Sequence, residues 1–129
     1  MTRPSLLSLL FAGLAVGASP CTQAQDPTLS DGDKYSVVLD NACVRVLRYQ
    51  DQPGDRTHEH QHPAFVVVAL APFKRRLALG DGRVMAREFK AGDAMYSPGE
   101  THIGENVGNT PTQVLMVEIK PGATCPAGR

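Results

Sequence analysis

Histidines provide the strongest chemical signal in this sequence. Three of the four, His58, His60 and His62, occupy alternate positions, and the fourth, His102, lies 40 residues after His62. Neutral imidazole is a common metal ligand, and three converging rings can hold one divalent ion. The residue type and its spacing therefore predict a metal site.

The flanking segments indicate that the first three histidines lie on a β-strand. Pro53-Gly54 marks a turn before them, and the apolar, β-branched run 64–70 follows them. Residues two apart in a strand point to the same face and lie about 6.6 Å apart along the chain. We therefore expect the three alternating histidines to share one face.

Residues 1–24 have the features of a secretory signal peptide. Arg3 supplies a positive start, residues 6–18 are apolar but too short to span a membrane as a helix, and Ala24 suits cleavage. Cys21 leaves a lipid-anchored form as the alternative. The segment predicts a periplasmic or secreted protein with no membrane segment after cleavage.

The composition excludes some classes of partner. Without its signal, the chain of about 105 residues carries 12 basic and 13 acidic side chains. It has no tryptophan, and aromatic residues make up 5% of the sequence. A near-neutral chain with few aromatic side chains gives no basis for binding nucleic acid or an anionic membrane. A small-molecule ligand is the partner that we expect.

Two cysteines, Cys43 and Cys125, remain after signal cleavage. An even number of cysteines in an oxidising compartment predicts a disulfide. The alternative is a buried Cys43 with a free thiol in the tail.

Short apolar runs separated by turn residues predict about nine strands and no substantial helix. The runs are residues 35–39, 44–49, 58–62, 64–70, 75–79, 83–89, 94–97, 102–106 and 113–119. This pattern favours an all-β sandwich or barrel of antiparallel strands. We expect one domain, residues 34–121, with a linker at 25–33 before it and a tail at 122–129 after it.

Two groups of residues resemble the two sequence motifs of cupins. The first group is Gly54, His60 and His62, and the second is Gly92, Pro98, Gly99, His102 and Asn106. The second group has one residue fewer than the motif between its proline and its histidine. The resemblance to a small single-domain cupin of the RmlC-like superfamily covers residues 41–120. It implies a jelly roll, or conical antiparallel β-barrel, with an internal ligand pocket and a homodimeric assembly.

The resemblance implies His60, His62 and His102 as metal ligands. His58 would be a fourth ligand or a partner of the ligands. Imidazole suits zinc, manganese, iron, nickel and copper alike, so the resemblance implies a divalent metal without resolving which one.

The glutamate that completes the ligand set of many cupins is absent here. Its two usual positions hold Val66 and Val67. A neutral ligand set favours an anionic ligand at an open coordination position. The resemblance implies a metal-dependent oxygenase, isomerase or lyase, and the alternative is a non-catalytic module that binds a small ligand or a metal.

Other charged residues admit two interpretations each. Glu100 and Glu105 flank His102 and are candidates for a general base or for a hydrogen-bond acceptor of a ligand histidine. Four arginines surround the hairpin predicted at residues 80–82. They form either a solvated strand edge or an anion-binding rim of the pocket. They are Arg75, Arg76, Arg83 and Arg87.

Overall fold

The computed structural model describes residues 26–126 of the chain. The predicted signal peptide and Cys21 lie outside the described residues. Between residues 26 and 126, no helix has the length and apolar character needed to cross a membrane.

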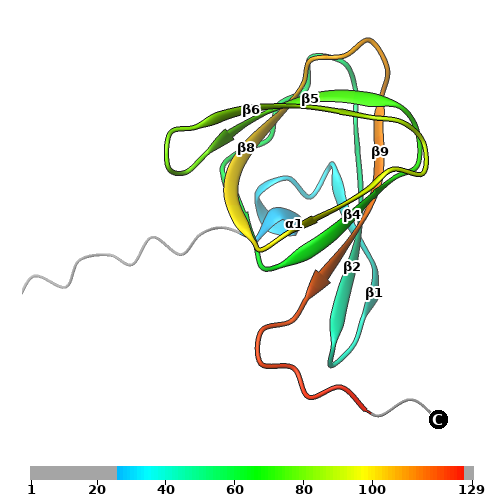
Figure 1. The fold of residues 1–129 in the computed structure, drawn as a ribbon, viewed down its shortest axis with the longest axis vertical. Coiled ribbons are helices and arrows are strands. Elements are labelled where there is room, and N and C mark those ends of the chain that lie inside the picture. The colour runs from blue at the N-terminus through cyan, green and yellow to red at the C-terminus, as the bar shows by residue number, and fades with distance from the viewer. Residues whose placement is uncertain (1–25, 127–129) are drawn as a thin grey trace, which may run out of the picture.

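Within residues 26–126, nine strands form two antiparallel sheets that face each other across a shared core (Figure 1). The strands are β1 (Tyr35–Asp40), β2 (Val44–Asp51), β3 (His60–His62), β4 (Phe65–Ala69), β5 (Phe73–Leu79), β6 (Val84–Phe89), β7 (Ala94–Ser97), β8 (Glu100–Asn106) and β9 (Thr112–Ile119). One sheet has the order β1-β2-β9-β4-β7, and the other has the order β3-β8-β5-β6. The prediction of an all-β cupin jelly roll is confirmed.

Strand alternation builds the core between the two sheets. In β4, Phe65, Val67 and Ala69 are buried, and in β9, Val114 and Met116 meet them. Successive side chains of a strand point to opposite faces, so Val66 faces away from the core while Val67 faces into it.

The histidine segment and the valine run, which the sequence predicts as separate strands, belong to different sheets. Strand β3 spans only His60–His62, and β4 begins at Phe65 in the other sheet. Pro63 stands between them. Proline has no backbone N–H for a sheet ladder, which suits a position where the chain leaves one sheet for the other.

Arg75 is buried in the core, so for this residue the prediction of a solvated edge is wrong. Its side chain lies on the inner face of β5, where Nη1 donates to Asp51 Oδ2 at 2.6 Å and Nη2 donates to the Tyr49 hydroxyl at 2.9 Å. Arg76 and Arg83 are exposed and pair with Glu105 and Asp81, as a solvated edge requires.

Cys43 and Cys125 form a disulfide, as predicted, with their Cα atoms 5.3 Å apart. The bond attaches the segment after β9 to the start of β2. Their separation of 82 residues means that the chain-entropy contribution is on the order of 4 kcal/mol.

The segment predicted as a linker is ordered against the barrel from residue 26 onward. It contains the short helix α1 (Pro27–Ser30), which begins after Asp26. The Asp26 side chain accepts a hydrogen bond from the backbone N–H of Thr28 at 2.9 Å, which is a typical helix N-cap. Asp31, directly after the helix, is only 2% exposed.

The fold predicts that Gly104→Ala is strongly destabilising. An added Cβ would lie 2.2 Å from Nη2 of Arg75, and that guanidinium is held by its buried ion pair with Asp51. Displacing one partner of a buried pair costs about 3–5 kcal/mol. Chemical denaturation of the variant measures the loss.

Gly80→Ala is the matched control, because its Cβ meets only Thr101, with 3.3 Å to the nearest atom. Equal unfolding free energies for the Gly104→Ala and Gly80→Ala variants would contradict the account of the Arg75 site.

Candidate metal centre

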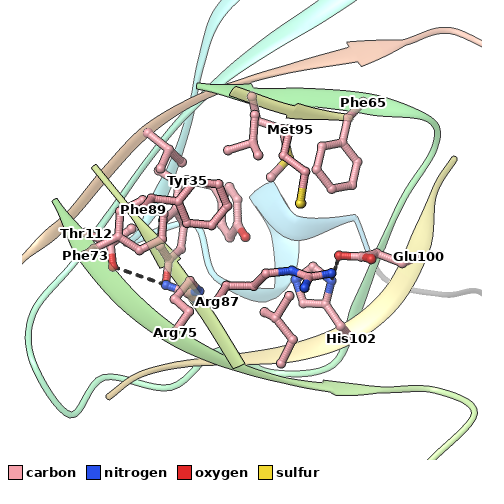
Figure 2. A pocket seen from close by; sticks show the side chains of 15 residues that line it. Tyr35, Phe65, Phe73, Arg75, Arg87, Phe89, Met95, Glu100, His102 and Thr112 are labelled. Carbon is pink, nitrogen blue, oxygen red and sulfur yellow. Dashed lines mark hydrogen bonds and ion pairs between the residues drawn. The ribbon is translucent and has the colours of Figure 1, made fainter. Parts of the chain in front are cut away.

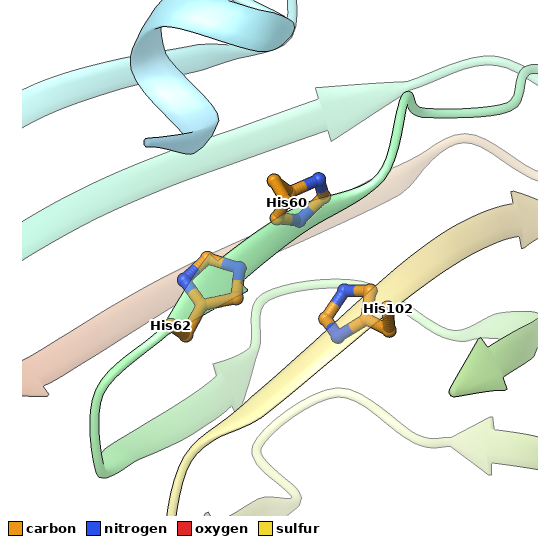
Figure 3. A group of neighbouring side chains, drawn as sticks. All are labelled: His60, His62 and His102. Atoms are coloured by element: carbon orange, nitrogen blue, oxygen red, sulfur yellow. The ribbon is translucent and has the colours of Figure 1, made fainter. Parts of the chain in front are cut away.

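Three of the predicted histidines meet inside the barrel. His60 and His62 come from β3, and His102 comes from the adjacent strand β8, where it pairs directly with His60 (Figure 3). All three side chains are buried, with residue exposures of 0%, 1% and 5%. One nitrogen of each ring lies within 4.8 Å of a nitrogen of the other two.

His60 is oriented by a backbone carbonyl. Its Nδ1 lies 2.9 Å from the carbonyl oxygen of His58, and its Nε2 lies 3.2 Å from the Tyr35 hydroxyl. A carbonyl oxygen only accepts, so this contact assigns the proton to Nδ1 and leaves the lone pair on Nε2. Burial raises the pKa of Tyr35, which therefore stays a neutral hydroxyl donor beside that lone pair.

A chain of charged groups orients His62. Its Nδ1 donates to Glu118 Oε1 at 2.7 Å, and Arg45 donates to the other oxygen of Glu118 at 2.6 Å and to Asp26 at 2.6 Å. Burial alone would raise the pKa of Glu118, but the hydrogen bonds from His62 and Arg45 hold it below its ordinary value. Glu118 is therefore an ionised acceptor that fixes the ring with Nε2 free.

His102 lies beside the carboxylate of Glu100. Its Nδ1 is 3.0 Å from Glu100 Oε1, but the ring is turned out of hydrogen-bond geometry, so we treat this contact as electrostatic. The contact with His102 is the main reason that the pKa of Glu100 is lowered. Of the two candidate glutamates, Glu100 is the one beside the histidines, whereas Glu105 pairs with Arg76 on the outside.

Two of the buried rings, His60 and His62, are held in the uncharged form near neutral pH. Burial, together with the neighbouring His102 and His62, lowers the pKa of His60 to about 4. Burial also lowers the pKa of His62, despite its hydrogen bond to Glu118. A metal ligand must be the neutral imidazole, so these environments favour the ligating form.

The donor set fits a divalent cation. Metal-binding histidines usually give their second ring nitrogen to a carboxylate or a carbonyl, and each Nδ1 here faces such an oxygen. His62 Nε2 is buried and has no hydrogen-bond partner within residues 26–126. Two nitrogens at about 2.0–2.1 Å from one ion lie at most about 4.2 Å apart. A small rotation of the rings therefore completes the site.

His58 lies outside the cluster, so the expectation that it shares the histidine face is corrected. Its side chain is 79% exposed, and its Nδ1 lies 3.1 Å from Asp31 Oδ1. The strand begins at His60, and the two-residue alternation does not extend back to His58. The contribution of His58 to the centre is its carbonyl oxygen, which accepts from His60.

Glu118 belongs to the centre but was missed in the sequence. Alternation in β9 puts Val114, Met116 and Glu118 on the buried face. A charged residue in that apolar series needs a buried partner, and this signal could have identified it.

An apolar cavity of about 60 Å³ adjoins His102, one of the three clustered histidines (Figure 2). His102 and Glu100 line one side of it, and Phe65, Val67 and Phe89 are among its apolar walls. Val67 therefore holds the inward one of the two positions where cupins carry a glutamate ligand.

Solved structures with this fold are similar to the chain over most of the described residues. A cupin domain from Bordetella pertussis Tohama I is 27% identical, with a TM-score of 0.61, over 67% of this chain and 91% of that one. A double-stranded β-helix protein from Klebsiella pneumoniae is also 27% identical, with a TM-score of 0.56, over 70% and 78%.

A further similar structure is that of a predicted oxalate decarboxylase from Thermotoga maritima. It is 26% identical, with a TM-score of 0.50, over 66% of this chain and 77% of that one. No protein-family model and no curated protein matches the chain. The two sheets, the paired histidine strands and these similarities agree: the chain is a small cupin domain with the RmlC-like double-stranded β-helix fold.

Proposed function

We propose that this protein is an exported cupin that binds a divalent metal through His60, His62 and His102. The remaining coordination positions face the apolar cavity and receive a small anionic ligand. The observation that carries the proposal is the convergence of nitrogens from three buried rings, two of which are fixed by hydrogen bonds from Nδ1 to an oxygen.

A bound divalent ion would polarise an oxygen of the ligand as a Lewis acid. The chain itself supplies orientation and exclusion of water. Glu118 and the His58 carbonyl hold two of the rings in place. The Tyr35 hydroxyl, neutral and buried beside His60, can donate to a ligand oxygen at the centre.

The charge of the donor set supports an anionic ligand. A ligating imidazole is neutral, and the carboxylates of Glu118 and Glu100 lie beside the Nδ1 atoms of His62 and His102. The ligand shell that the chain provides therefore carries no negative charge. The similarity to a predicted oxalate decarboxylase supports a carboxylate as the anion.

The size of the cavity supports a small ligand. A water molecule needs about 10–15 Å³ of such space, so about 60 Å³ holds roughly four to six waters. An organic acid of a few carbon atoms fits this volume.

The disulfide supports the proposal of export. Disulfides persist in the periplasm and outside the cell, and they are rare in the reducing cytosol of mesophiles. The bond between Cys43 and Cys125 agrees with the predicted signal peptide.

Single alanine substitutions test the ligand set. Replacing His60, His62 or His102 should weaken metal affinity more than about 100-fold, since even a change of a residue that orients a ligand costs about 10–100-fold. Elemental analysis of protein recovered from the exported fraction measures the occupancy, and circular dichroism checks the fold.

His58→Ala is the control, because the exposed ring lies outside the cluster and the backbone carbonyl is retained. Equal metal content in the His102→Ala variant and in the parent would rule out the proposed centre.

Metal retention should extend to unusually low pH. Protonated imidazole cannot ligate, and the pKa of His60 is lowered to about 4 from an ordinary value of 6.5. The metal should therefore stay bound when the pH falls from about 7 to 5 and should be released on approach to about 4. Elemental analysis after dialysis at a series of pH values measures the release.

The metal-free protein gives an independent check on the same groups. Its unfolded state binds more protons than its folded state between about pH 4 and 6.5, because the folded-state pKa of His60 is lowered. The contribution of His60 to the free energy of unfolding should be at its maximum above pH 6.5 and should decrease towards pH 4. For the metal-loaded protein, release of the metal near pH 6.5 would contradict the lowered pKa of the buried His60 ring.

Val67→Glu should tighten metal retention and weaken the binding of a simple carboxylate. The new side chain would enter the cavity that His102 lines and would supply the anionic charge that an external ligand otherwise brings. Val66→Glu is the matched control, since Val66 faces away from the core.

Metal and acetate titrations of the two variants measure both effects. An identical response of the two variants would show that the assigned register of β4 beside the centre is wrong.

A further inference from the structure

Arg87 stands where the barrel opens. It lies on β6, the edge strand of one sheet, and the next strand, β7, is the edge of the other sheet. Alternation along β6 turns Arg87 and Phe89 inward, while Glu88 between them is exposed. In Figure 2 the Arg87 side chain reaches across the cavity towards the side where His102 and Glu100 lie.

Two hollows meet at Arg87. The inner one is the cavity beside His102, and the outer one is a groove of about 240 Å³ that Tyr96, Pro98 and other residues line. Arg87, Met95 and Glu100 line both hollows. These three residues therefore form the neck through which a ligand would pass from the surface to the cavity.

The guanidinium of Arg87 has no anionic partner in the part of the chain that the structure describes. No carboxylate lies within 4.0 Å of it, and its buried Nε has no hydrogen-bond partner there. The contact of Nη2 is a weak one, with Met85 Sδ at 3.9 Å. A buried donor without a partner is unfavourable, so an acceptor from outside would stabilise it.

The other charged groups of the cavity are already engaged. Arg75 donates to Asp51 at 2.6 Å, which neutralises its charge. Glu100 lies 3.0 Å from His102 and accepts from Ser97 at 3.4 Å. Two arginines, Arg75 and Arg87, line the cavity. Within residues 26–126, Arg87 is the one of the two whose charge remains available for an external anion.

We propose that Arg87 is the carboxylate-binding residue of this site and that the ligand is a small organic acid with a short apolar chain. The planar guanidinium presents N–H donors in the geometry that a carboxylate accepts. The apolar chain of the acid packs against Phe65, Phe89 and Met95. This inference rests on the proposed metal-binding function and names the ligand class of the same site.

Calorimetric titration with butyrate tests the inference, with butanamide as the neutral isostere. The proteins are the parent, Arg87→Gln, Arg87→Lys and Arg48→Gln, each measured metal-loaded and metal-free, with metal content determined in every sample. Arg48→Gln removes the same charge from an exposed position on β2 and is the matched control.

The parent should bind butyrate and not butanamide. Arg87→Gln should weaken butyrate binding about 10–100-fold with unchanged metal content, and Arg87→Lys should weaken it less, because lysine keeps the charge but lacks the planar fork. Arg48→Gln should behave as the parent.

Three results would each overturn the inference. Arg87→Gln could bind butyrate as tightly as the parent, Arg87→Gln and Arg48→Gln could lose equal affinity, or the parent could fail to bind butyrate. Absence of metal from the loaded parent would instead overturn the proposed function. The metal-free titrations would then still test Arg87. A difference in butyrate affinity between the parent and Arg87→Gln would support its role, and equal affinities would refute that role.

Discussion

The structure depends on one constraint: three imidazole rings are buried together, and each needs an acceptor for its Nδ1 proton. The His58 carbonyl and the Glu118 carboxylate meet this need at His60 and His62, and the Glu100 carboxylate lies 3.0 Å from Nδ1 of His102. A buried carboxylate needs partners in turn, and Glu118 finds a second one in Arg45, which also binds Asp26 beside α1. Satisfying the histidines thus links both sheets and the segment before β1 into one network.

This arrangement separates the two electrostatic roles that a glutamate ligand would combine. The negative charge of Glu118 lies one layer out, where it orients His62, and Glu100 lies beside His102 at the cavity wall. The position that a ligand carboxylate would occupy belongs to Val67, an apolar wall of the cavity. A bound cation beside this apolar wall, with Arg87 at the mouth and unpaired within residues 26–126, would suit a small organic anion.

Most of the fold and the three histidines could be predicted from the sequence, because the period-two alternation and the turn residues are local signals. The parts that could not be predicted depend on pairing between distant segments. Pro63 separates the two predicted runs, but the local sequence does not show that β3 and β4 belong to different sheets. His58 and Arg75 were misplaced because a local pattern does not tell where a strand begins or which face of it is buried. Glu118 acquires its role only when β9 brings it opposite Phe65, a partner 53 residues earlier in the chain.

X-ray absorption at the metal edge of the loaded protein tests the central claim most directly, because it reports the atoms bound to the ion. The account predicts three nitrogen scatterers at about 2.0–2.1 Å with the outer-shell pattern of imidazole, and oxygen scatterers in the remaining positions. Addition of a small carboxylate should change the oxygen shell and leave the three imidazoles in place. A spectrum with fewer than three imidazoles, or with sulfur in the first shell, would contradict the assignment of His60, His62 and His102 as the ligand set.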